Sequence, residues 1–355
     1  MIQKYYKIVS CSTKKISNMK FRYYLLALLS LSLMFNACNK SDGDPPIESV
    51  NAVDRAEQQI IDNDSLVGYF ETHYYNSGDF VGNPSPSIND LVITELADGE
   101  TVPAEHTLLI DAVETKTTFY LDTDYEYYVL KLNQGAGDTP NFTDTVRLNY
   151  SGNLLDESVF DSSINPIDFD LTALIKGWAL VIPEFNTSEL FVENGDGTVS
   201  YYNSGTGVMF LPSGLGYFSG ISPGIPIYSP LIFRFELFQT RVNDHDSDGV
   251  PSYLEDIDGD KDVVNDDTDN NFLSNYVDPD DDGDGVLTIN ELEPKTYTVN
   301  TNEGEQEPIL GSKEFEISRT ESNGVITIKT VTIMDSNNDG VDDYLDNEVT
   351  IDYSE

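Results

Sequence analysis

Acidic side chains recur at alternate positions in three short segments near the carboxyl end of the chain. Each segment reads D-x-[DN]-x-D-G and has a further acidic residue at its twelfth position. Alternate carboxylates can direct their oxygens to one point, the glycine permits a sharp turn, and the twelfth residue closes the shell around a hard cation such as Ca²⁺. The predicted calcium ligands are Asp244, Asp246, Asp248 and Glu255 in the first loop, Asp280, Asp282, Asp284 and Glu291 in the second, and Asp335, Asn337, Asp339 and Asp346 in the third.

A fourth, looser array of acidic residues lies between the first two loops. It comprises Asp256, Asp258, Asp260 and Asp262, followed by Asp266 and Asp269, and it has Val263 where glycine is expected. Pro251 and Pro279 disfavour the helices that flank EF-hand loops, so the repeats resemble thrombospondin type-3-like repeats more than paired EF-hands. We expect structural Ca²⁺ to stabilise this extension, which has few apolar residues to bury. A solvated acidic linker is the alternative.

The overall composition limits the other chemistry available to the chain. Its 355 residues include 19 basic and 63 acidic side chains, which gives a formal net charge of -44. A surface this anionic repels phosphate backbones, so nucleic acid is not an expected partner. Hydrophobic residues make up 39% of the chain, which is enough for a folded core. Three histidines and two cysteines give no basis for a multi-histidine zinc centre or a disulfide framework, so zinc and redox catalysis are not expected.

The amino terminus is typical of an export signal. Basic residues precede an apolar run at 25–35, which is too short to span a bilayer. The run ends in FNAC (35–38), which resembles a bacterial lipoprotein box and predicts lipidation of Cys38, with residues 1–37 removed and 38–50 as a tether. Residues 1–18 could be a mis-assigned start, because a complete signal begins at Met19. An ordinary signal peptide, with a cysteine that is not lipidated, is the alternative to the lipoprotein signal. The expected location is the outer membrane or cell surface of a Gram-negative bacterium.

Hydrophobic periodicity indicates an α+β protein with most of its order in the middle of the chain. Helical spacing covers residues 52–75, where Asp64 and Ser65 could begin a second short helix, and strand signals follow near 91–93, 107–110, 119–120 and 125–132. Residues 145–241 contain strands at 146–150, 208–211 and 231–238 and a helix at 171–179, which predicts an antiparallel sheet wrapped on one short helix. The expected regions are 51–130 (helical and β, with no motif that gives it a role), 131–242 (central domain), 243–294 (calcium repeats) and 295–355 (β-rich, with the third loop).

Five short motifs occur in order along the central domain. They are VRLNYSG (146–152), VFDSS (159–163), LIKGW (174–178), LPSGLGY (211–217), and GIP (224–226) followed by PLIFRFEL (230–237). Each motif alone has little specificity, but their order over residues 146–237 resembles the FKBP-type peptidyl-prolyl cis-trans isomerases. The resemblance implies the FKBP-like fold and a pocket for a prolyl ring.

Rotation about an X–Pro bond has a barrier of about 20 kcal/mol, which arises from amide resonance. A dry aromatic pocket that binds the twisted amide better than the planar one lowers this barrier without a nucleophile, metal or cofactor. The resemblance implies Trp178 as the pocket floor and Tyr150, Phe160 and Phe233 as its walls, with Ile167 at a wall position where the family usually has an aromatic residue. It implies Leu174 and Ile175 as the rim and Ile225 as the cover of the pocket. The Ile175 N–H and the Tyr217 hydroxyl would donate to substrate carbonyls, and Asp161 would lie beside the amide or bind Tyr150.

These observations predict a lipid-anchored peptidyl-prolyl isomerase that acts on proline-containing polypeptide clients of the cell envelope or surface. A non-catalytic FKBP-like peptide-binding module and a calcium-stiffened surface adhesion protein are the alternatives. Between Ile182 and Val208 the chain has an insertion with the turn signals NG and DG at 194–197, which predict a hairpin. This hairpin could extend the contacts with substrate or shield the pocket.

Overall fold

The computed structural model describes residues 53–354. The predicted signal segment, its apolar run, the tether and Cys38 all lie outside the described residues. Within residues 53–354, no helix has both the length and the apolar character that crossing a membrane requires.

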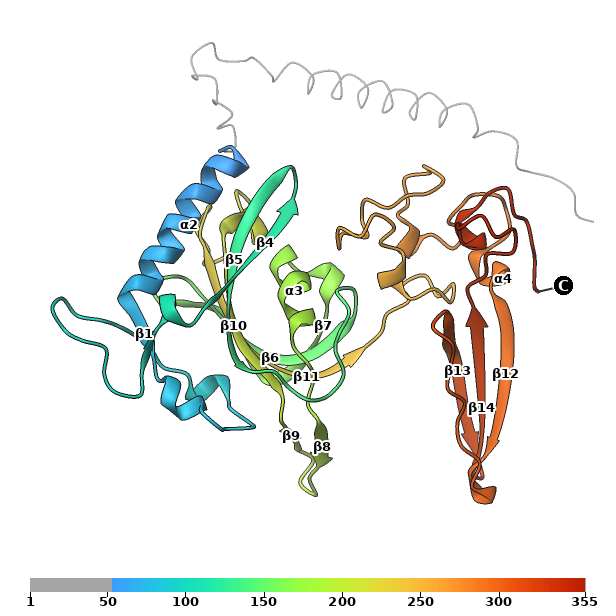
Figure 1. The fold of residues 1–355 in the computed structure, drawn as a ribbon, viewed down its shortest axis with the longest axis horizontal. Helices are drawn as coiled ribbons and strands as arrows, with labels where there is room; N and C mark the ends of the chain where they lie inside the picture. Colours follow the sequence, from blue (N-terminus) through green and yellow to red (C-terminus); the bar gives the residue numbers. More distant parts are fainter. Residues whose placement is uncertain (1–52, 355) are drawn as a thin grey trace, which may run out of the picture. The chain divides into compact units, whose positions relative to one another are not determined.

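A six-stranded antiparallel sheet organises the middle part of the chain (Figure 1). Its strand order is β4-β5-β10-β11-β6-β7, so strands from distant parts of the chain are neighbours. The strands are β4 (Glu114–Tyr120), β5 (Thr123–Asn133), β6 (Thr145–Asn153), β7 (Val159–Asp170), β10 (Gly205–Leu211) and β11 (Leu231–Arg241). The strands predicted at 146–150, 208–211 and 231–238 are confirmed. The expected domain division at residue 130 falls inside β5, because β4 and β5 belong to the same sheet as the strands that follow.

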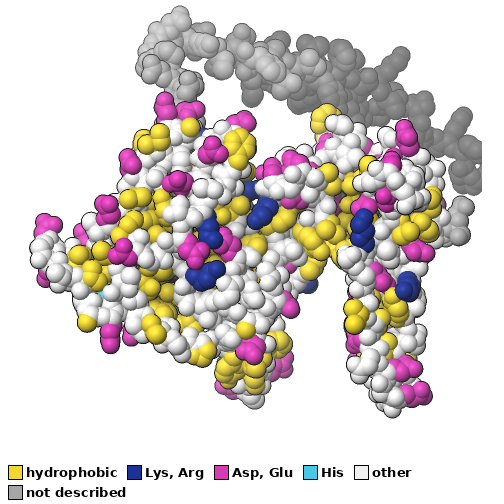
Figure 2. Space-filling model, in the orientation of Figure 1, with side chains coloured by type: hydrophobic (Ala, Val, Ile, Leu, Met, Phe, Trp, Pro, Cys, Tyr) yellow, Lys and Arg dark blue, Asp and Glu magenta, His cyan; other side chains and the backbone are white. Residues whose placement is uncertain are grey.

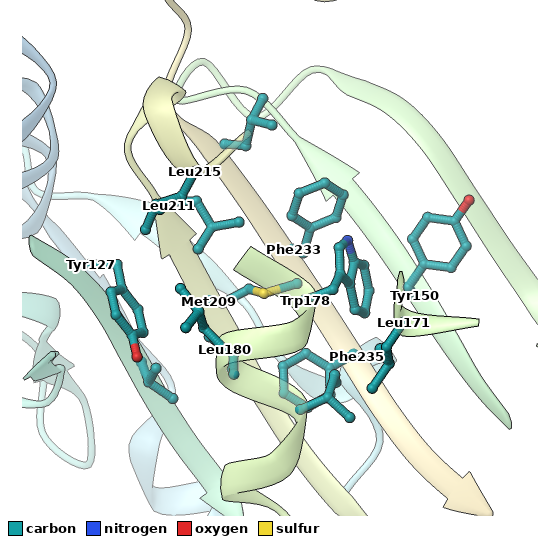
Figure 3. Close-up of a cluster of buried hydrophobic side chains, with 14 of the residues drawn as sticks. Tyr127, Tyr150, Leu171, Trp178, Leu180, Met209, Leu211, Leu215, Phe233 and Phe235 are labelled. Carbon is teal, nitrogen blue, oxygen red and sulfur yellow. The ribbon is translucent and has the colours of Figure 1, made fainter. Parts of the chain in front are cut away.

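One face of the sheet packs against the short helix α3 (Lys176–Val181). The helix predicted at 171–179 is divided in two, because Leu174 and Ile175 have extended backbone between the single 3₁₀ turn Leu171–Ala173 and α3. Trp178, Leu180 and Val181 of α3 are buried in an apolar cluster with side chains of β6, β10 and β11, several of which are shown in Figure 3. The predicted arrangement of a short helix on an antiparallel sheet is therefore confirmed.

The opposite face of the sheet is covered by the longer helix α2 (Arg55–Thr72). Asp54 caps this helix by accepting hydrogen bonds from the N–H groups of Ala56 and Glu57. The helix is continuous, so the second helix predicted from Asp64 is wrong; Ser65 lies inside the helix and its hydroxyl donates to the Ile61 carbonyl. Side chains of α2, β5, β10 and β11 form the second apolar cluster, which includes Leu66, Phe70, Tyr128, Leu130, Val208, Phe210 and Ile232.

Shorter elements follow α2 along the chain, and a further hairpin is inserted between the strands of the central sheet. A three-stranded antiparallel sheet combines β1 (His73–Tyr75), β2 (Ile93–Glu95) and β3 (Thr107–Leu108), so the strand expected at 91–93 begins at its last residue. The strand signal at 109–110 is wrong, because Leu109–Asp111 is a 3₁₀ turn. The predicted hairpin is present as β8 (Leu190–Glu193) and β9 (Val199–Tyr202), and its tip is closed by a hydrogen bond from the Asn194 N–H to the Thr198 carbonyl.

The acidic segment contains little regular structure and leads into a separate sheet. Its only α-helical element among the described residues is α4 (Thr288–Glu291), a single turn. The following strands β12 (Glu293–Asn300), β13 (Glu314–Ser322) and β14 (Val325–Thr332) form an antiparallel sheet in which β14 is central. The β-rich character predicted for 295–355 is thus confirmed for its first part, and the sheet begins two residues earlier.

Substitutions in helix α2 can test whether this helix contributes to the stability of the core. Leu66 is fully buried, whereas Ile60 on the same helix is 65% exposed. We expect Leu66→Ala to lower the free energy of unfolding by about 2–5 kcal/mol, because it leaves a cavity against the sheet. The matched variant Ile60→Ala should change it by less than about 0.5 kcal/mol. Urea titration monitored by Trp178 fluorescence measures both, and equal effects of the two variants would show that α2 does not contribute to the core.

Candidate functional site

Aromatic rings surround Trp178 on the side of the sheet that carries α3 (Figure 3). The ring centroid of Phe233 lies 5.1 Å from that of the indole, and Tyr150 meets the indole edge to face at 5.9 Å and 86°. Phe160 contacts Phe233 in the same manner, at 5.5 Å and 89°. Gly152 permits this contact, because a Cβ at this position would lie 2.6 Å from the Phe160 ring. The predicted floor and walls are therefore brought together from α3, β6, β7 and β11.

One aromatic wall was not recognised in the sequence. Phe169 of β7 lies 5.3 Å from Tyr150 and 6.1 Å from Trp178, measured between ring centroids. Ile167, which the motif comparison placed at the wall, is partly buried against the same cluster. Phe169 stands two residues further along β7 and so on the same face of the strand, which is the signal that could have identified it.

The polar groups of the site lie at its rim. The Tyr150 hydroxyl donates to Asp161 Oδ2 at 2.5 Å, so Asp161 has the hydrogen bond that the second of the two roles considered for it requires. Burial, together with the hydrogen bond to Asp161, raises the pKa of Tyr150 above its usual value. Asp161 is exposed and Tyr217 is 40% exposed, so both side chains are accessible to a bound peptide.

The remaining predicted residues border the aromatic cluster. Leu174 and Ile175 are half-buried against it, and Ile225 is buried within it. Ile175 is the N-cap residue of α3, and among the described residues its N–H donates to no backbone carbonyl. This amide is therefore available to a substrate carbonyl, as the motif comparison implies.

Helix α2 holds the segment that carries Tyr217. Asp62 Oδ2 accepts hydrogen bonds from both the N–H and the hydroxyl of Ser213, at 2.7 and 2.6 Å. Arg55 donates to the Gly214 carbonyl at 3.2 Å, and its guanidinium lies 4.3 Å from the centroid of the Phe218 ring. Burial raises the pKa of the Asp62 carboxyl, although the hydrogen bonds from Ser213 and Gln58 oppose this effect. No local sequence pattern predicts this support, because the two partners are 151 residues apart in the chain.

Many of the predicted calcium ligands gather into four groups of carboxylates, each with its ligand atoms within 4.8 Å of one another, but Glu291 is in none of these groups. Three groups follow the predicted loops: Asp244, Asp246 and Asp248; Asp256, Asp258 and Asp260; and Asp280, Asp282 and Asp284. The fourth combines Asp248 and Glu255 with Asp281, which was not predicted. Burial, and then the charges of Asp248 and Asp281, raises the pKa of Glu255 to about 11. In the third predicted loop, Asn337 donates to both Asp339 and Asp346, so these residues are also brought together.

Each of these loops has the same backbone. The fourth and sixth residues have positive φ, as in Gly283 and Gly285 (70° and 95°) and in Asn338 and Gly340 (61° and 98°). The first carboxylate accepts a hydrogen bond from the sixth N–H group, as Asp244 does from Gly249, Asp256 from Lys261 and Asp335 from Gly340. These shared features allow loops to be recognised where the sequence pattern is incomplete.

The looser array divides into two such loops. In the first, the sixth position is Lys261 (φ 64°), so Val263 is not the residue that replaces glycine. Asp262 lies outside the carboxylate group and faces Lys176, whose Nζ is 3.7 Å from its Oδ2, so the structure does not bring this side chain together with Asp256, Asp258 and Asp260. The second loop begins at Asp267, which accepts from the N–H groups of Asn271 and Phe272. Its sixth residue, Phe272, has a φ of 77° without being glycine, which explains why the sequence pattern missed this loop.

Comparison with known proteins identifies two regions. A family model described as FKBP-type peptidyl-prolyl cis-trans isomerase matches residues 137–238, which contain the aromatic site. This part of the chain is therefore similar to the FKBP-type isomerases. A second model, described as BamM C-terminal, matches residues 245–327. The resemblance found for the acidic segment is therefore to this family, and the expected resemblance to thrombospondin type-3-like repeats is not confirmed.

Individual relatives match the same central part of the chain. The FKBP-type 22 kDa peptidyl-prolyl cis-trans isomerase of Escherichia coli (strain K12) is 32% identical over 114 residues, which cover 30% of this chain and 47% of the relative. The isomerase FkpA of the same strain is 31% identical over 110 residues, which cover 30% of this chain and 35% of FkpA. A crystal structure of E. coli FkpA has a TM-score of 0.27 and 28% identity, covering 32% of this chain and 48% of that chain. The chain thus spans less than half the length of these relatives.

The support of the Tyr217 segment by α2 can be tested without reference to activity. Asp62→Asn replaces a carboxylate that accepts from Ser213 and Gln58 by an amide that can satisfy only part of these donors. We expect the free energy of unfolding to fall by about 1–3 kcal/mol. Amide hydrogen exchange should accelerate at Ser213, Gly216 and Phe218, while Asp64→Asn at an exposed position of the same helix should leave all three amides unchanged. Unchanged protection in Asp62→Asn would refute the assigned role.

Proposed function

We propose that the central domain catalyses cis–trans isomerisation of X–Pro bonds in proteins of the cell envelope or surface. The observation that carries this proposal is the arrangement around Trp178: an indole enclosed by aromatic rings, with the half-buried Leu174 and Ile175 packed against the same cluster. We place the Ile175 N–H and the Tyr217 hydroxyl at its rim as donors to the substrate. The FKBP-type match of residues 137–238 supports the same reaction.

The mechanism follows from the character of this site. The indole is only 3% exposed, so a prolyl ring contacts it from the side of the half-buried rim residues Phe160, Leu174 and Ile175. The aromatic surroundings exclude water, and the loss of hydration removes a stabilisation that favours the planar, charge-separated amide. Donors from Ile175 and Tyr217 hold the flanking carbonyls while the imide turns, so the pocket binds the twisted amide best. No covalent step occurs, and the chemistry requires no metal or prosthetic group.

The Tyr150–Asp161 hydrogen bond positions the Tyr150 ring, which is one aromatic wall of the site, next to the X–Pro bond that rotates. Tyr150 is 7% exposed, and its ring contacts both Trp178 and Phe169. Its hydroxyl, directed at Asp161, fixes the ring at the edge of the site and leaves the apolar face toward the indole. Asp161 therefore acts on the reaction through Tyr150, whose ring it holds in position beside the proposed site of the substrate amide.

A second candidate function is the binding of unfolded client segments, which the β8–β9 hairpin favours. Figure 2 shows apolar side chains gathered on this hairpin. Several of them are 41% to 50% exposed, namely Leu190, Phe191, Val192, Val199 and Tyr202. Exposed apolar patches rimmed by polar residues are typical of interaction sites for other polypeptides. In this function the hairpin retains proline-containing segments near the pocket, with or without turnover.

An isomerase assay on the full chain distinguishes these candidates. We expect the wild-type protein to accelerate exchange between the cis and trans forms of an X–Pro tetrapeptide, measured by NMR exchange spectroscopy. Tyr217→Phe removes one hydrogen bond to substrate, worth about 1 kcal/mol, and should lower kcat/KM about five-fold. Asp161→Asn should lower it as well, whereas Asp156→Asn, at an exposed position of the β6–β7 turn, should leave it unchanged. Binding of the peptide without any acceleration would favour the second candidate.

The proposed anchor is tested by fractionation. Lipidation of Cys38 would hold the chain at a membrane surface, because each buried methylene of an acyl chain contributes about 0.8 kcal/mol. We expect the expressed protein to sediment with membranes and to incorporate labelled palmitate, and Cys38→Ser to abolish the label and release the protein into the soluble fraction. Membrane association that persists in Cys38→Ser without label would disprove lipid anchoring at this residue.

A further inference from the structure

Three carboxylates converge where the first and second acidic loops meet. Glu255, Asp281 and Asp248 are 0%, 1% and 2% exposed, and their ligand atoms lie within 4.8 Å of one another. Among the ion pairs of residues 53–354, none involves these three side chains. The group therefore concentrates negative charge in the interior without a basic partner.

The free oxygens of this group have no hydrogen-bond donor. Both carboxylate oxygens of Glu255 are buried and unpartnered, as are Asp248 Oδ2 and Asp281 Oδ1. The other oxygens of the aspartates are engaged: Asp248 Oδ1 accepts from the Val250 N–H at 2.8 Å, and Asp281 Oδ2 accepts from the Thr288 hydroxyl at 3.0 Å. These bonds fix each aspartate so that its remaining oxygen faces the group. Buried charges persist in folded proteins when they are paired or bound to a metal ion, which indicates a cation here.

An apolar cluster holds the two loops in this arrangement. Val250 of the first loop, Leu292 after the second and Tyr344 of the third are buried together with Val331 and Ile333. Gly249 is packed so closely that a Cβ would lie 2.9 Å from Ile289. The convergence of the carboxylates is therefore built by the packing of the loops and is not a chance approach of mobile surface side chains.

We propose that one Ca²⁺ ion is held jointly by the two loops, with Asp248 and Glu255 from the first and Asp281 from the second. Oxygens that share a calcium ion at 2.3–2.6 Å can be at most about 5 Å apart, and the observed group meets this limit. Asp246 Oδ2, also buried and unpartnered, adds an oxygen from the first loop. An all-oxygen set with this many carboxylates suits Ca²⁺ better than Zn²⁺, which prefers nitrogen and sulfur.

Asp281 is the residue that separates this proposal from independent calcium loops. It occupies the second position of its own loop, and that position supplies no ligand when each loop binds its ion alone. In the shared site the Asp281 carboxylate binds the ion of the first loop. Calcium then links residues 244–255 to residues 280–291. The loss of the Asp281 carboxylate in the second loop therefore weakens calcium binding in the first loop.

Calcium titration of the full chain tests this coupling. We expect calorimetry on the chelator-treated protein to show that Asp281→Asn weakens one calcium site at least ten-fold, and that Asp352→Asn, which removes the same charge at an exposed position, has no effect. Amide exchange with and without Ca²⁺ locates the change: calcium should protect Val250 and Asp281 in the wild type, and Asp281→Asn should lose the protection of Val250 in the other loop.

Glu255→Gln provides a second, independent variant. If both carboxylates bind the same ion, the double variant Asp281→Asn/Glu255→Gln should lose little more affinity than either single variant, because the shared site is already lost. The circular dichroism of all variants must match the wild type in the presence of Ca²⁺, and a variant that fails this check is replaced by Asp281→Ser. Unchanged calcium affinity in Asp281→Asn, additive losses in the double variant, or a loss of protection confined to residues 280–291 would each overturn the proposal.

Discussion

Strand β10 is buried along its whole length, and the rest of the described central domain depends on the need to cover both of its faces. Met209 and Leu211 face the cluster that contains Trp178, while Val208 and Phe210 face the cluster beneath α2. Alternate residues of a strand point to opposite faces, so a strand that is buried at every position requires a layer on each side. Helix α3 supplies one layer and α2 the other. The aromatic site is therefore part of a core that is covered on both sides, and this explains how its rings are held in fixed positions.

The sequence was informative where function depends on short, ordered motifs. The order of the five motifs identified Trp178, Tyr150 and Phe233 as neighbours, because each lies within a run whose spacing the fold preserves. It did not identify Phe169, whose role depends on the pleat of β7, or the support that α2 gives to the Tyr217 segment. Asp62 and Ser213 meet only because α2 crosses the sheet, and no local pattern records a contact between residues this far apart in the chain.

The acidic segment shows the same distinction between local and distant information. Spacing alone predicted the groups that begin at Asp244, Asp256 and Asp280, because alternation and the turn at the sixth position are local properties. It missed the loop that begins at Asp267, where Phe272 adopts a backbone conformation that the pattern reserves for glycine. It also missed Asp281, because the approach of this residue to Glu255 depends on the apolar cluster that joins the loops.

The position of β5 has a consequence for any attempt to isolate the part of the chain that matches the FKBP family model. That match begins at residue 137, whereas β5 ends at Asn133 and α2 ends at Thr72. A fragment cut at the match boundary would leave β10 as an edge strand, with unpaired backbone groups and a bare apolar surface where α2 had been. Such edges readily pair with other chains, so the excised fragment would be prone to aggregate. The smallest autonomous unit of this protein therefore extends well upstream of its recognisable motifs.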